Sequence, residues 1–317
     1  MTATPLGPGR EFDAIRAMQR RWGPAAQGLG DDCAVLDVPA GEHLCVSTDS
    51  SLEDVHFRRE WLTPEEIGYR AAAAALSDLA AVAARPLGML VAIAVPPMWR
   101  EALDEIAGGL GEAARAADAP ILGGDTTGGA TLALTVTVLG ATSAPLLRSG
   151  AQPGDRVYVT GVLGGPAAAL RALLRGERPR PDDRARFARP TPRLREARWL
   201  AARGATACVD VSDGLLADAG HLAAASGVRV VLDLDRLPVV SGANVRDAAH
   251  SGEEYELVVT AREPLDARHF QADLGTRLSE VGRVEAADVP GGVLPGVEAR
   301  SRGARVDLPL GYDHFSV

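Results

Sequence analysis

Seven aspartates stand next to apolar segments of the chain or inside them, in positions where carboxylates could bind a divalent cation. Three belong to short polar motifs: Asp49 in CVSTDS, Asp125 in ILGGDTTGG and Asp213 in CVDVSDGLL. The other four are Asp31, Asp32, Asp78 and Asp210. Carboxylates beside serine and threonine hydroxyls, as in STD and VSD, are hard oxygen ligands that suit Mg²⁺, which often bridges substrate phosphates. The pattern therefore predicts phosphate chemistry on Mg²⁺.

Asp78 is the acid whose surroundings need the most explanation. It lies inside the alanine-rich segment AAAAALSDLAAVAA, which has the composition of a buried helix. A carboxylate in an apolar setting is costly unless it is paired, protonated or bound to a metal. The chain contains no lysine, so all 33 basic residues are arginines. A divalent cation is therefore the readiest partner for Asp78.

Each acid taken alone also has a simpler interpretation, because aspartates are common in Gly-Asp turns and at helix N-caps. The shared setting of seven acids favours the metal site. His56 in LEDVHF fits a hydrogen-bonded surface residue as well as a ligand. The glycines of TGVLGGPAAAL do not have the G-x-G-x-x-G spacing of a dinucleotide site, although this helix start could present amides to an anion.

The composition excludes several classes of function. Without lysine there is no P-loop lysine, no protein-kinase strand lysine and no Schiff-base lysine. A net charge of -9 argues against nucleic acid as a partner. No apolar run is long enough for a membrane span, and the N-terminal residues lack a secretion pattern, so we expect a cytoplasmic protein. We expect Cys33, Cys45 and Cys208 to be buried, reduced thiols because they are few and scattered.

Predicted strands and helices are mixed in both halves of the chain. The pattern predicts strands at 33–38, 43–50, 87–96, 132–140, 157–161, 206–211, 228–234, 255–261, 278–284 and 304–308. It predicts helices at 10–22, 63–85, 99–117, 166–176 and about 213–226. Thr63 with Glu66 three residues later is typical of a helix start. Strict strand–helix alternation is absent, which favours an α+β fold over a doubly wound sheet.

The length predicts two domains, because single cores seldom grow beyond about 250–300 residues. Proline and glycine in the segment 141–156 mark the boundary. We place an N-terminal domain with ATP, Mg²⁺ and dimer contacts at 1–144 and a C-terminal α+β domain at 145–317. The arginine- and proline-rich tract 177–193 is expected to be a surface loop with a short helix.

Eight motifs together carry a resemblance to a known family. They are GDDCAVL, STDSSLEDVHF, ALSDLAAVAARP, ILGGDTTGG, RSGAQPGDRVYVTG, DVSDGLLADAGHLA, SGEEYELVVT and GYDHF. In order and approximate spacing, over nearly the whole chain, they resemble those of thiamine-monophosphate kinases. That resemblance implies an ATP-binding superfamily that includes aminoimidazole ribonucleotide synthetase. It also implies a homodimer of α+β protomers, in which the N-terminal mixed or antiparallel sheets of both subunits build a shared β-barrel.

The resemblance further implies that ATP phosphorylates thiamine monophosphate to thiamine diphosphate by direct in-line transfer. The implied ligands of several Mg²⁺ ions are Asp32, Ser47, Thr48, Asp49, Asp78, Asp125, Asp210 and Asp213. The implied ATP-binding residues are Gly124, Asp125, Arg148 and Ser212, and the implied substrate-binding residues are His56, Glu253 and Tyr312. Asp49, Asp125 and Asp213 are expected to matter most. No general base is implied, because the attacking phosphate oxygen is already ionised.

Three residues depart from the pattern of that family and put the detail of substrate binding in question. Ser251 stands where many relatives have glycine, Glu254 where they have aspartate, and Gly128 where they often have arginine. Two other functions remain open: a different enzyme of the superfamily, such as a selenophosphate synthetase or a carbamoyl-dehydrating maturation protein, and a nucleotide-binding protein without turnover. Against a selenophosphate synthetase, no cysteine precedes Cys33.

Overall fold

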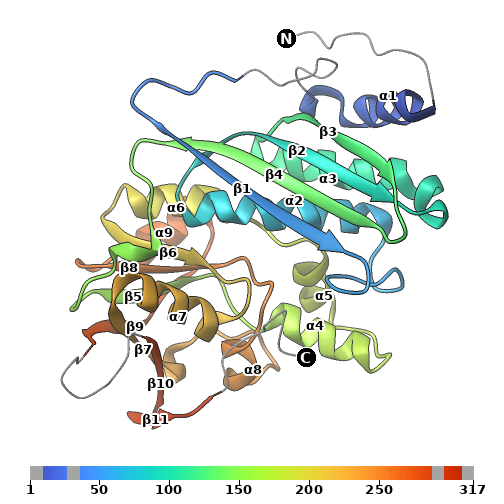
Figure 1. The fold of residues 1–317 in the computed structure, drawn as a ribbon. Helices are drawn as coiled ribbons and strands as arrows, with labels where there is room; N and C mark the ends of the chain where they lie inside the picture. The colour runs from blue at the N-terminus through green and yellow to red at the C-terminus, as the bar shows by residue number, and fades with distance from the viewer. Residues whose placement is uncertain (1–9, 27–35, 288–295, 309–317) are drawn as a thin grey trace. The chain divides into compact units, whose positions relative to one another are not determined.

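The structure is a computed structural model that describes residues 10–26, 36–287 and 296–308 (Figure 1). Helices and strands are mixed along the whole described chain. No helix among these residues is both long and apolar enough to cross a lipid bilayer.

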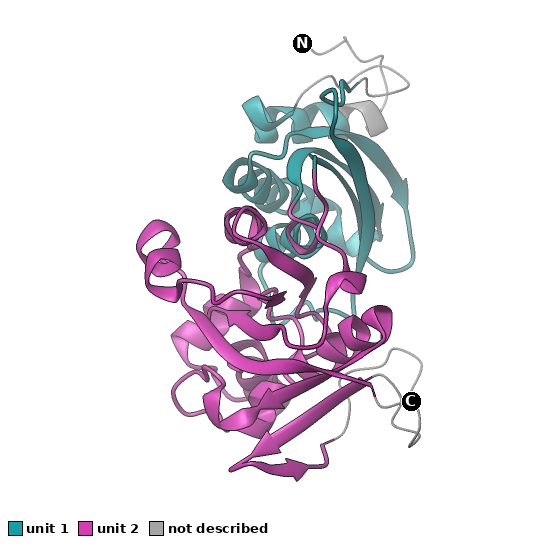
Figure 2. Ribbon diagram, turned by 90° about the vertical axis from the view of Figure 1, so that its left-hand side faces the viewer, with its two compact units in different colours: residues 1–79, 84–143 teal, residues 80–83, 144–317 magenta. Residues whose placement is uncertain are grey.

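Figure 2 shows that the chain divides into two compact units. Unit 1 comprises residues 1–79 and 84–143, and unit 2 comprises residues 80–83 and 144–317. The predicted α+β architecture in two parts is confirmed by this division and by the mixed sheets of both units. The functional roles assigned to 1–144 and 145–317 stay predictions.

Unit 1 contains an open four-stranded sheet. In spatial order its strands are β1 (His43–Leu52), β4 (Ala133–Thr142), β2 (Arg85–Val95) and β3 (Ile121–Gly128). Strand β4 pairs antiparallel with both β1 and β2, whereas β2 and β3 run parallel. The sheet is therefore mixed, and its two edges are β1 and β3.

Helices cover one face of this sheet (Figure 1). They are α2 (Pro64–Ala81) and α3 (Leu103–Ala117). Helix α1 (Arg10–Trp22) packs mainly against α3, and the short 3₁₀ helices are η1 (Gly23–Ala25) and η2 (Pro97–Ala102). Along β4, buried Leu134, Val136 and Val138 alternate with half-buried residues, as expected when one sheet face packs on helices. Glycines bring α2 and α3 close together, because a Cβ on Gly109 would lie 1.8 Å from the carbonyl oxygen of Glu65.

The start of α2 is the capping box that the sequence predicts. The amide of Glu66 donates to Oγ1 of Thr63 at 3.2 Å, and the amide of Thr63 donates to Oε2 of Glu66 at 2.9 Å. The helix ends at Ala81, four residues before the predicted end. The chain turns at Ala83, which has a positive φ of 56°, and enters β2 at Arg85.

Unit 2 contains a seven-stranded sheet. In spatial order its strands are β11 (Ala304–Val306), β10 (Gly296–Ser301), β7 (Val228–Asp233), β9 (Leu278–Ala286), β5 (Arg156–Thr160), β8 (Leu257–Ala261) and β6 (Ala205–Asp210). Every pair is antiparallel except the parallel pair of β10 and β7. Mostly antiparallel pairing without strict strand–helix alternation agrees with the predicted α+β class.

The remaining helices belong to unit 2. They are α4 (Gly165–Leu174), α5 (Pro181–Ala188), α6 (Leu194–Ala201), α7 (Leu215–Ser226), α8 (Val245–Ala249) and α9 (Ala267–Leu274), with η3 (Arg148–Gly150) and η4 (Leu234–Arg236). Helix α7 contributes Leu215, Ala219 and Leu222 to a core cluster that also includes Val209 of β6 and Val230 of β7. This packing holds α7, and the loop that precedes it, against the sheet.

Three further predictions about elements differ from the structure. Residues 36–38 form no strand, and 33–35 lie outside the described residues. The predicted helix 99–117 begins as η2, so α3 starts only at Leu103. The tract 177–193 contains the expected short helix, α5, and several exposed residues, but Phe187 of α5 is only 1% exposed. A single aromatic residue in a charged tract therefore anchors the tract to the unit.

Candidate active site

Strand β1 carries three of the predicted Mg²⁺ ligands. Ser47 pairs in register with Val138, and Asp49 pairs with Val136. Both valines are buried on the face that the helices cover, so Ser47 and Asp49 occupy that same face. Ser47 donates its hydroxyl hydrogen to Oδ2 of Asp78 on α2 at 2.6 Å. The structure therefore brings Ser47 and Asp78 into direct contact and places Asp49 beside them.

Thr48, between Ser47 and Asp49, belongs to the other face of the sheet. It pairs with Thr137 of β4, and the two Oγ1 atoms lie 3.0 Å apart. Successive side chains of a strand point to opposite faces. The motif STD is therefore divided between the two faces.

The sequence pattern suggested that Gly124 and Asp125 lie at the end of a strand. In the structure, both lie inside β3. The register of the sheet places Gly124 in one row with Val91, Val136 and Asp49. Because β3 and β1 are opposite edges, this row spans three strand spacings, or about 14 Å. Within one copy of the chain, the exposed Asp125 is thus on the far edge from Asp49.

A second group of acids lies in unit 2, where β6 ends at the buried residue Asp210. The next loop carries Ser212 and Asp213 and leads into α7. Oδ2 of Asp218 accepts hydrogen bonds from the amides of Ser212 at 3.0 Å, Asp213 at 3.1 Å and Gly214 at 3.1 Å. One buried carboxylate oxygen on the first turn of α7 therefore sets the shape of the loop.

The carboxylates of Asp210 and Asp213 repel the carboxylate of Asp218. Burial, followed by the charges of Asp210 and Asp213, raises the pKa of Asp218 to about 8. Asp213, Asp218 and the exposed His221 each offer a ligand atom, and these atoms lie within 4.8 Å of one another. Carboxylate oxygens in such a cluster suit a hard divalent cation, whose charge would relieve the repulsion. The two carboxylates therefore fit Mg²⁺, whereas the imidazole of His221 is a nitrogen donor that suits transition metals better.

The segment 250–256 lies against this loop. The amide of Glu253 donates to the carbonyl oxygen of Ser212 at 2.7 Å, and the amide of Tyr255 donates to that of Val211 at 2.9 Å. In return, the amide of Val211 donates to the carbonyl oxygen of Glu256 at 2.7 Å. A predicted substrate residue, Glu253, is thus directly bonded to a predicted ATP residue, Ser212.

Arg148, the remaining predicted ATP residue, lies at a different place in unit 2. Its carbonyl oxygen accepts a hydrogen bond of 2.6 Å from Oγ of Ser226, the last residue of α7. Ser212 precedes the first turn of that helix, so the length of α7, about 18 Å, separates the two backbones. The structure therefore does not bring Arg148 together with Ser212.

His56 lies in the turn that follows β1. The amide of Leu52 donates to its Nδ1 at 3.1 Å, so in the neutral ring the hydrogen is on Nε2. Asp32 and Tyr312, the other two predicted site residues, lie outside the described residues.

The three departures from the family pattern have different surroundings. Ser251 is fully buried, and its Oγ accepts a hydrogen bond from the amide of Ala167 at 3.3 Å. The carboxylate of Glu254 accepts a hydrogen bond from the amide of Gly164 at the start of α4. Gly128 has open space around the position of a Cβ. Ser251 and Glu254 therefore have partners of their own in unit 2.

Sequence reasoning missed Asp218, whose carboxylate shapes the loop of Ser212 and Asp213. The signal was the motif SDGLLAD, in which an acid in the first turn of a helix can turn back to the preceding amides. It also missed Glu256, which the alternation in EEYE places two residues from Glu254 and on the same side of the chain.

Comparison with known proteins identifies the family. Residues 30–142 match the AIR synthase related protein N-terminal domain, and residues 152–294 match the AIR synthase related protein C-terminal domain. The thiamine-monophosphate kinase of Salmonella typhimurium is 35% identical, and the alignment covers 97% of this chain and 96% of that protein.

Two solved structures are similar over nearly the whole chain. The thiamine-monophosphate kinase of Stenotrophomonas maltophilia K279a has a TM-score of 0.80 and 35% identity, covering 94% of this chain and 98% of the other. AaThiL complexed with AMPPCP and TMP has a TM-score of 0.76 and 29% identity, covering 96% and 97%. The chain therefore belongs to the thiamine-monophosphate kinase family of AIR synthase related proteins.

Proposed function

We propose that this protein transfers the γ-phosphoryl group of ATP to thiamine monophosphate, giving thiamine diphosphate and ADP. The observation that carries the proposal is the 2.7 Å hydrogen bond between Glu253, a candidate for acceptor binding, and Ser212, a candidate for ATP binding. Relatives over nearly the whole chain are thiamine-monophosphate kinases, and the related AaThiL was solved with AMPPCP and TMP. A cytoplasmic location is consistent with this use of ATP.

The acids of both units would hold Mg²⁺ in this reaction, with Ser47, Asp49 and Asp78 in unit 1 and Asp210 and Asp213 in unit 2. When bound there, Mg²⁺ would reduce the electrostatic repulsion between the two phosphate groups. The chain itself orients the two substrates. The acceptor phosphate is already ionised, so direct in-line attack needs neither a general base nor a phosphoenzyme.

We further propose that the enzyme is a homodimer in which two four-stranded sheets close a shared barrel. On the edge strand β1, Leu44 is 48% exposed and Val46 is 58% exposed, which is unusual for large apolar side chains of a sheet. A second copy would cover them and pair the open edges. It would also supply its own Asp125 to the site that contains Asp49; within one copy, Asp125 lies at the opposite edge of the sheet from Asp49 and on the other face.

The direct test of activity mixes purified protein with ATP, Mg²⁺ and thiamine monophosphate and measures thiamine diphosphate by chromatography. The wild type is expected to form it, and Asp213→Asn is expected to lose most of the activity while still folding. Selenide and aminoimidazole precursors serve as control acceptors. If the wild type releases ADP only with one of these acceptors, the proposed acceptor is wrong. Binding of AMPPCP with Mg²⁺ without any turnover would indicate a nucleotide-binding protein.

The shared site is tested with two variants that carry different affinity tags. Asp49→Asn and Asp125→Asn are each expected to be inactive as homodimers. Two-step purification of the co-expressed chains isolates the mixed dimer, which has one intact site if each site takes one aspartate from each copy. About half of the wild-type activity should then return. A mixed dimer as inactive as its parents would show that each copy supplies both aspartates to its own site.

A further inference from the structure

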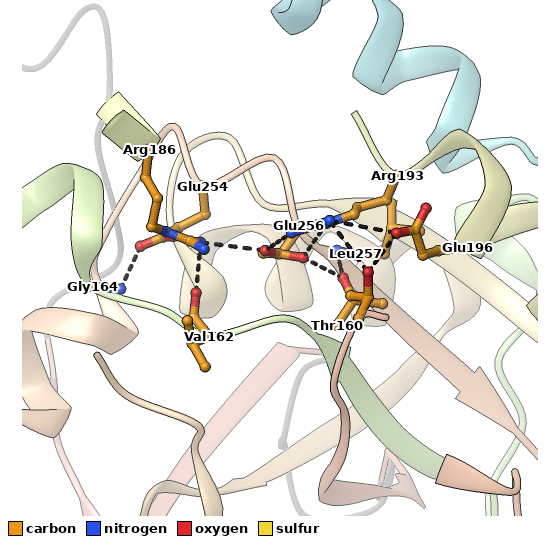
Figure 3. A network of polar contacts seen from close by, with 10 residues as sticks. Thr160, Val162, Gly164, Arg186, Arg193, Glu196, Glu254, Glu256 and Leu257 are labelled. Carbon is orange, nitrogen blue, oxygen red and sulfur yellow. Dashed lines mark hydrogen bonds and ion pairs between the residues drawn. The ribbon is translucent and has the colours of Figure 1, made fainter. Parts of the chain in front are cut away.

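Two buried glutamates follow Glu253 in the segment 250–256. Glu254 is 4% exposed and Glu256 is fully buried, and both side chains enter a network of polar contacts (Figure 3). Arg193 binds Glu256 through two parallel bonds, from Nε to Oε2 at 2.7 Å and from Nη2 to Oε1 at 2.6 Å. Oγ1 of Thr160 adds a third bond to Oε2 at 2.7 Å. Glu256 is thus held from two directions by charged and neutral donors.

Arg186 joins the two glutamates. Its Nη2 lies 3.0 Å from Oε2 of Glu254 and 3.3 Å from Oε1 of Glu256, and it donates to the carbonyl oxygen of Val162 at 2.7 Å (Figure 3). The other oxygen of Glu254 accepts from the amide of Gly164. One guanidinium therefore connects the segment 250–256 to the loop that opens α4.

Both arginines come from the tract 177–193, which sequence analysis expected at the surface. Arg186 belongs to α5, and Arg193 precedes α6. The tract is therefore fastened to the segment 250–256 by buried ion pairs. Breaking one partner of such a pair leaves an uncompensated buried charge, which favours displacement of the segment.

The segment that these bonds hold has an unusual backbone. Glu253 has a φ of 58° and Tyr255 a φ of 51°, so two residues without the freedom of glycine adopt left-handed conformations. They alternate with Glu254 and Glu256, whose side chains are anchored. Such conformations persist where the surroundings over-determine them. The anchored glutamates supply that constraint on either side of Tyr255.

We propose that Arg186 and Arg193 are positioning residues for the acceptor substrate: by holding Glu254 and Glu256, they set Glu253 beside Ser212. This inference deepens the proposed kinase function, and its substrate arm rests on that function. The arginines act through the segment 250–256 and touch neither substrate. Arg193 needs its fork-shaped guanidinium, because a lysine can supply a charge but cannot make two parallel bonds to one carboxylate.

The test compares Arg193→Lys with Arg195→Lys, a matched replacement of an exposed arginine two residues later on α6. Hydrogen exchange is measured on the amides of Glu253 and Tyr255, which donate to the 211–212 backbone. Kinetics are measured separately for both substrates. For Arg193→Lys we expect at least tenfold faster exchange at these two amides. We also expect a KM for thiamine monophosphate at least tenfold higher, with the KM for ATP changed less than twofold. Arg195→Lys should match the wild type.

Several results would overturn the proposal. The proposal is wrong if the amides of Glu253 and Tyr255 exchange at the wild-type rate in Arg193→Lys, even if activity changes. It is also wrong if the KM values for ATP and for thiamine monophosphate rise equally. If Arg193→Lys fails to fold, Arg186→Gln, which removes the cation between Glu254 and Glu256, is subject to the same criteria. If the wild type makes no thiamine diphosphate, the proposed function fails, and exchange alone then decides whether the arginines hold Glu253 in place.

Discussion

Ser47 donates its hydroxyl hydrogen to Oδ2 of Asp78 at 2.6 Å, which joins strand β1 to helix α2 and orients the Asp78 carboxylate. Hydrogen bonds to charged groups contribute about 1.5–3 kcal/mol. The bond therefore affects both the stability of unit 1 and the direction in which Asp78 presents its oxygens.

Ser47→Ala is expected to lower the free energy of unfolding by about 2 kcal/mol. It should also raise the Mg²⁺ concentration for half-maximal activity about tenfold, the usual scale when a metal ligand loses its orienting partner. Urea denaturation and Mg²⁺ titration of the kinase activity measure the two effects. Ser50→Ala is the matched control, because it removes a 2.9 Å hydroxyl bond to Thr135 on the other face. If Ser47→Ala and Ser50→Ala raise the Mg²⁺ concentration for half-maximal activity equally, the prediction is wrong.

Asp218→Ala should destabilise unit 2 and disturb nucleotide binding. The substitution leaves the amides of Ser212, Asp213 and Gly214 without their common acceptor, at an expected cost of about 3 kcal/mol or more. Chemical denaturation and titration with AMPPCP plus Mg²⁺ measure both effects. His221→Ala serves as control, since His221 is exposed and accepts none of these bonds. A larger loss of Mg²⁺ binding in the control would indicate that the histidine is a ligand.

Glu254 should make the stability of the fold depend on pH. Burial raises its pKa to about 7 from the ordinary value of 4.5, with Arg186 opposing the rise. The folded state then holds this proton more tightly than the unfolded state. The stability it contributes is fully present below about pH 4.5 and is lost as pH rises through about 7.

Glu254→Gln removes that titration. The difference in unfolding free energy between wild type and Glu254→Gln should therefore fall from pH 4.5 to 7 and stay constant above it. Urea denaturation at a series of pH values measures the difference, and Glu263→Gln, which replaces an exposed carboxylate, is the control. A difference that stays flat, or rises with pH, would show that Glu254 is ionised in the folded state across this range.

Gly124→Ala should disrupt the pairing of β3 with β2. The new Cβ would lie 1.8 Å from the carbonyl oxygen of Val91, so one of the two strands has to shift. We expect a loss of about 2–3 kcal/mol in unfolding free energy and loss of activity, because Asp125 follows directly. Gly128→Ala in the same strand has nothing within 4 Å and should change stability by less than about 0.5 kcal/mol. If thermal denaturation shows the same loss of stability for Gly124→Ala and Gly128→Ala, the prediction is wrong.

Val46→Glu should break the proposed dimer. A carboxylate on the exposed edge strand β1 would be buried without a partner in a shared barrel. Light scattering coupled to size-exclusion chromatography should therefore give the mass of one chain, with activity lost in parallel. Leu174→Glu on α4 is the matched control, because Leu174 and Val46 are both 58% exposed. The Leu174→Glu variant should remain dimeric. A monomeric wild type would refute the dimer itself.

Local features of the protein could be predicted from the sequence. The capping box of Thr63 and Glu66 involves atoms three residues apart, and the Ser-Thr-Asp motif is recognisable without any knowledge of its neighbours. The α+β class follows in the same way from the order of short apolar runs. These features depend on interactions within one turn of helix or one strand, which the residue pattern describes directly.

The tertiary structure alone decided which residues meet. Ser47 and Asp78 are 31 residues apart, and Glu256 and Arg193 are 63 residues apart, so no local pattern links them. Strand order placed Asp49 and Asp125 at opposite edges of one sheet, although their motifs look alike. Burial raised the pKa of Glu254, and Arg186 and Arg193 of an arginine-rich tract pair with buried glutamates. Strand order and burial arise from the packing of the whole chain, and a local sequence pattern contains no information about that packing.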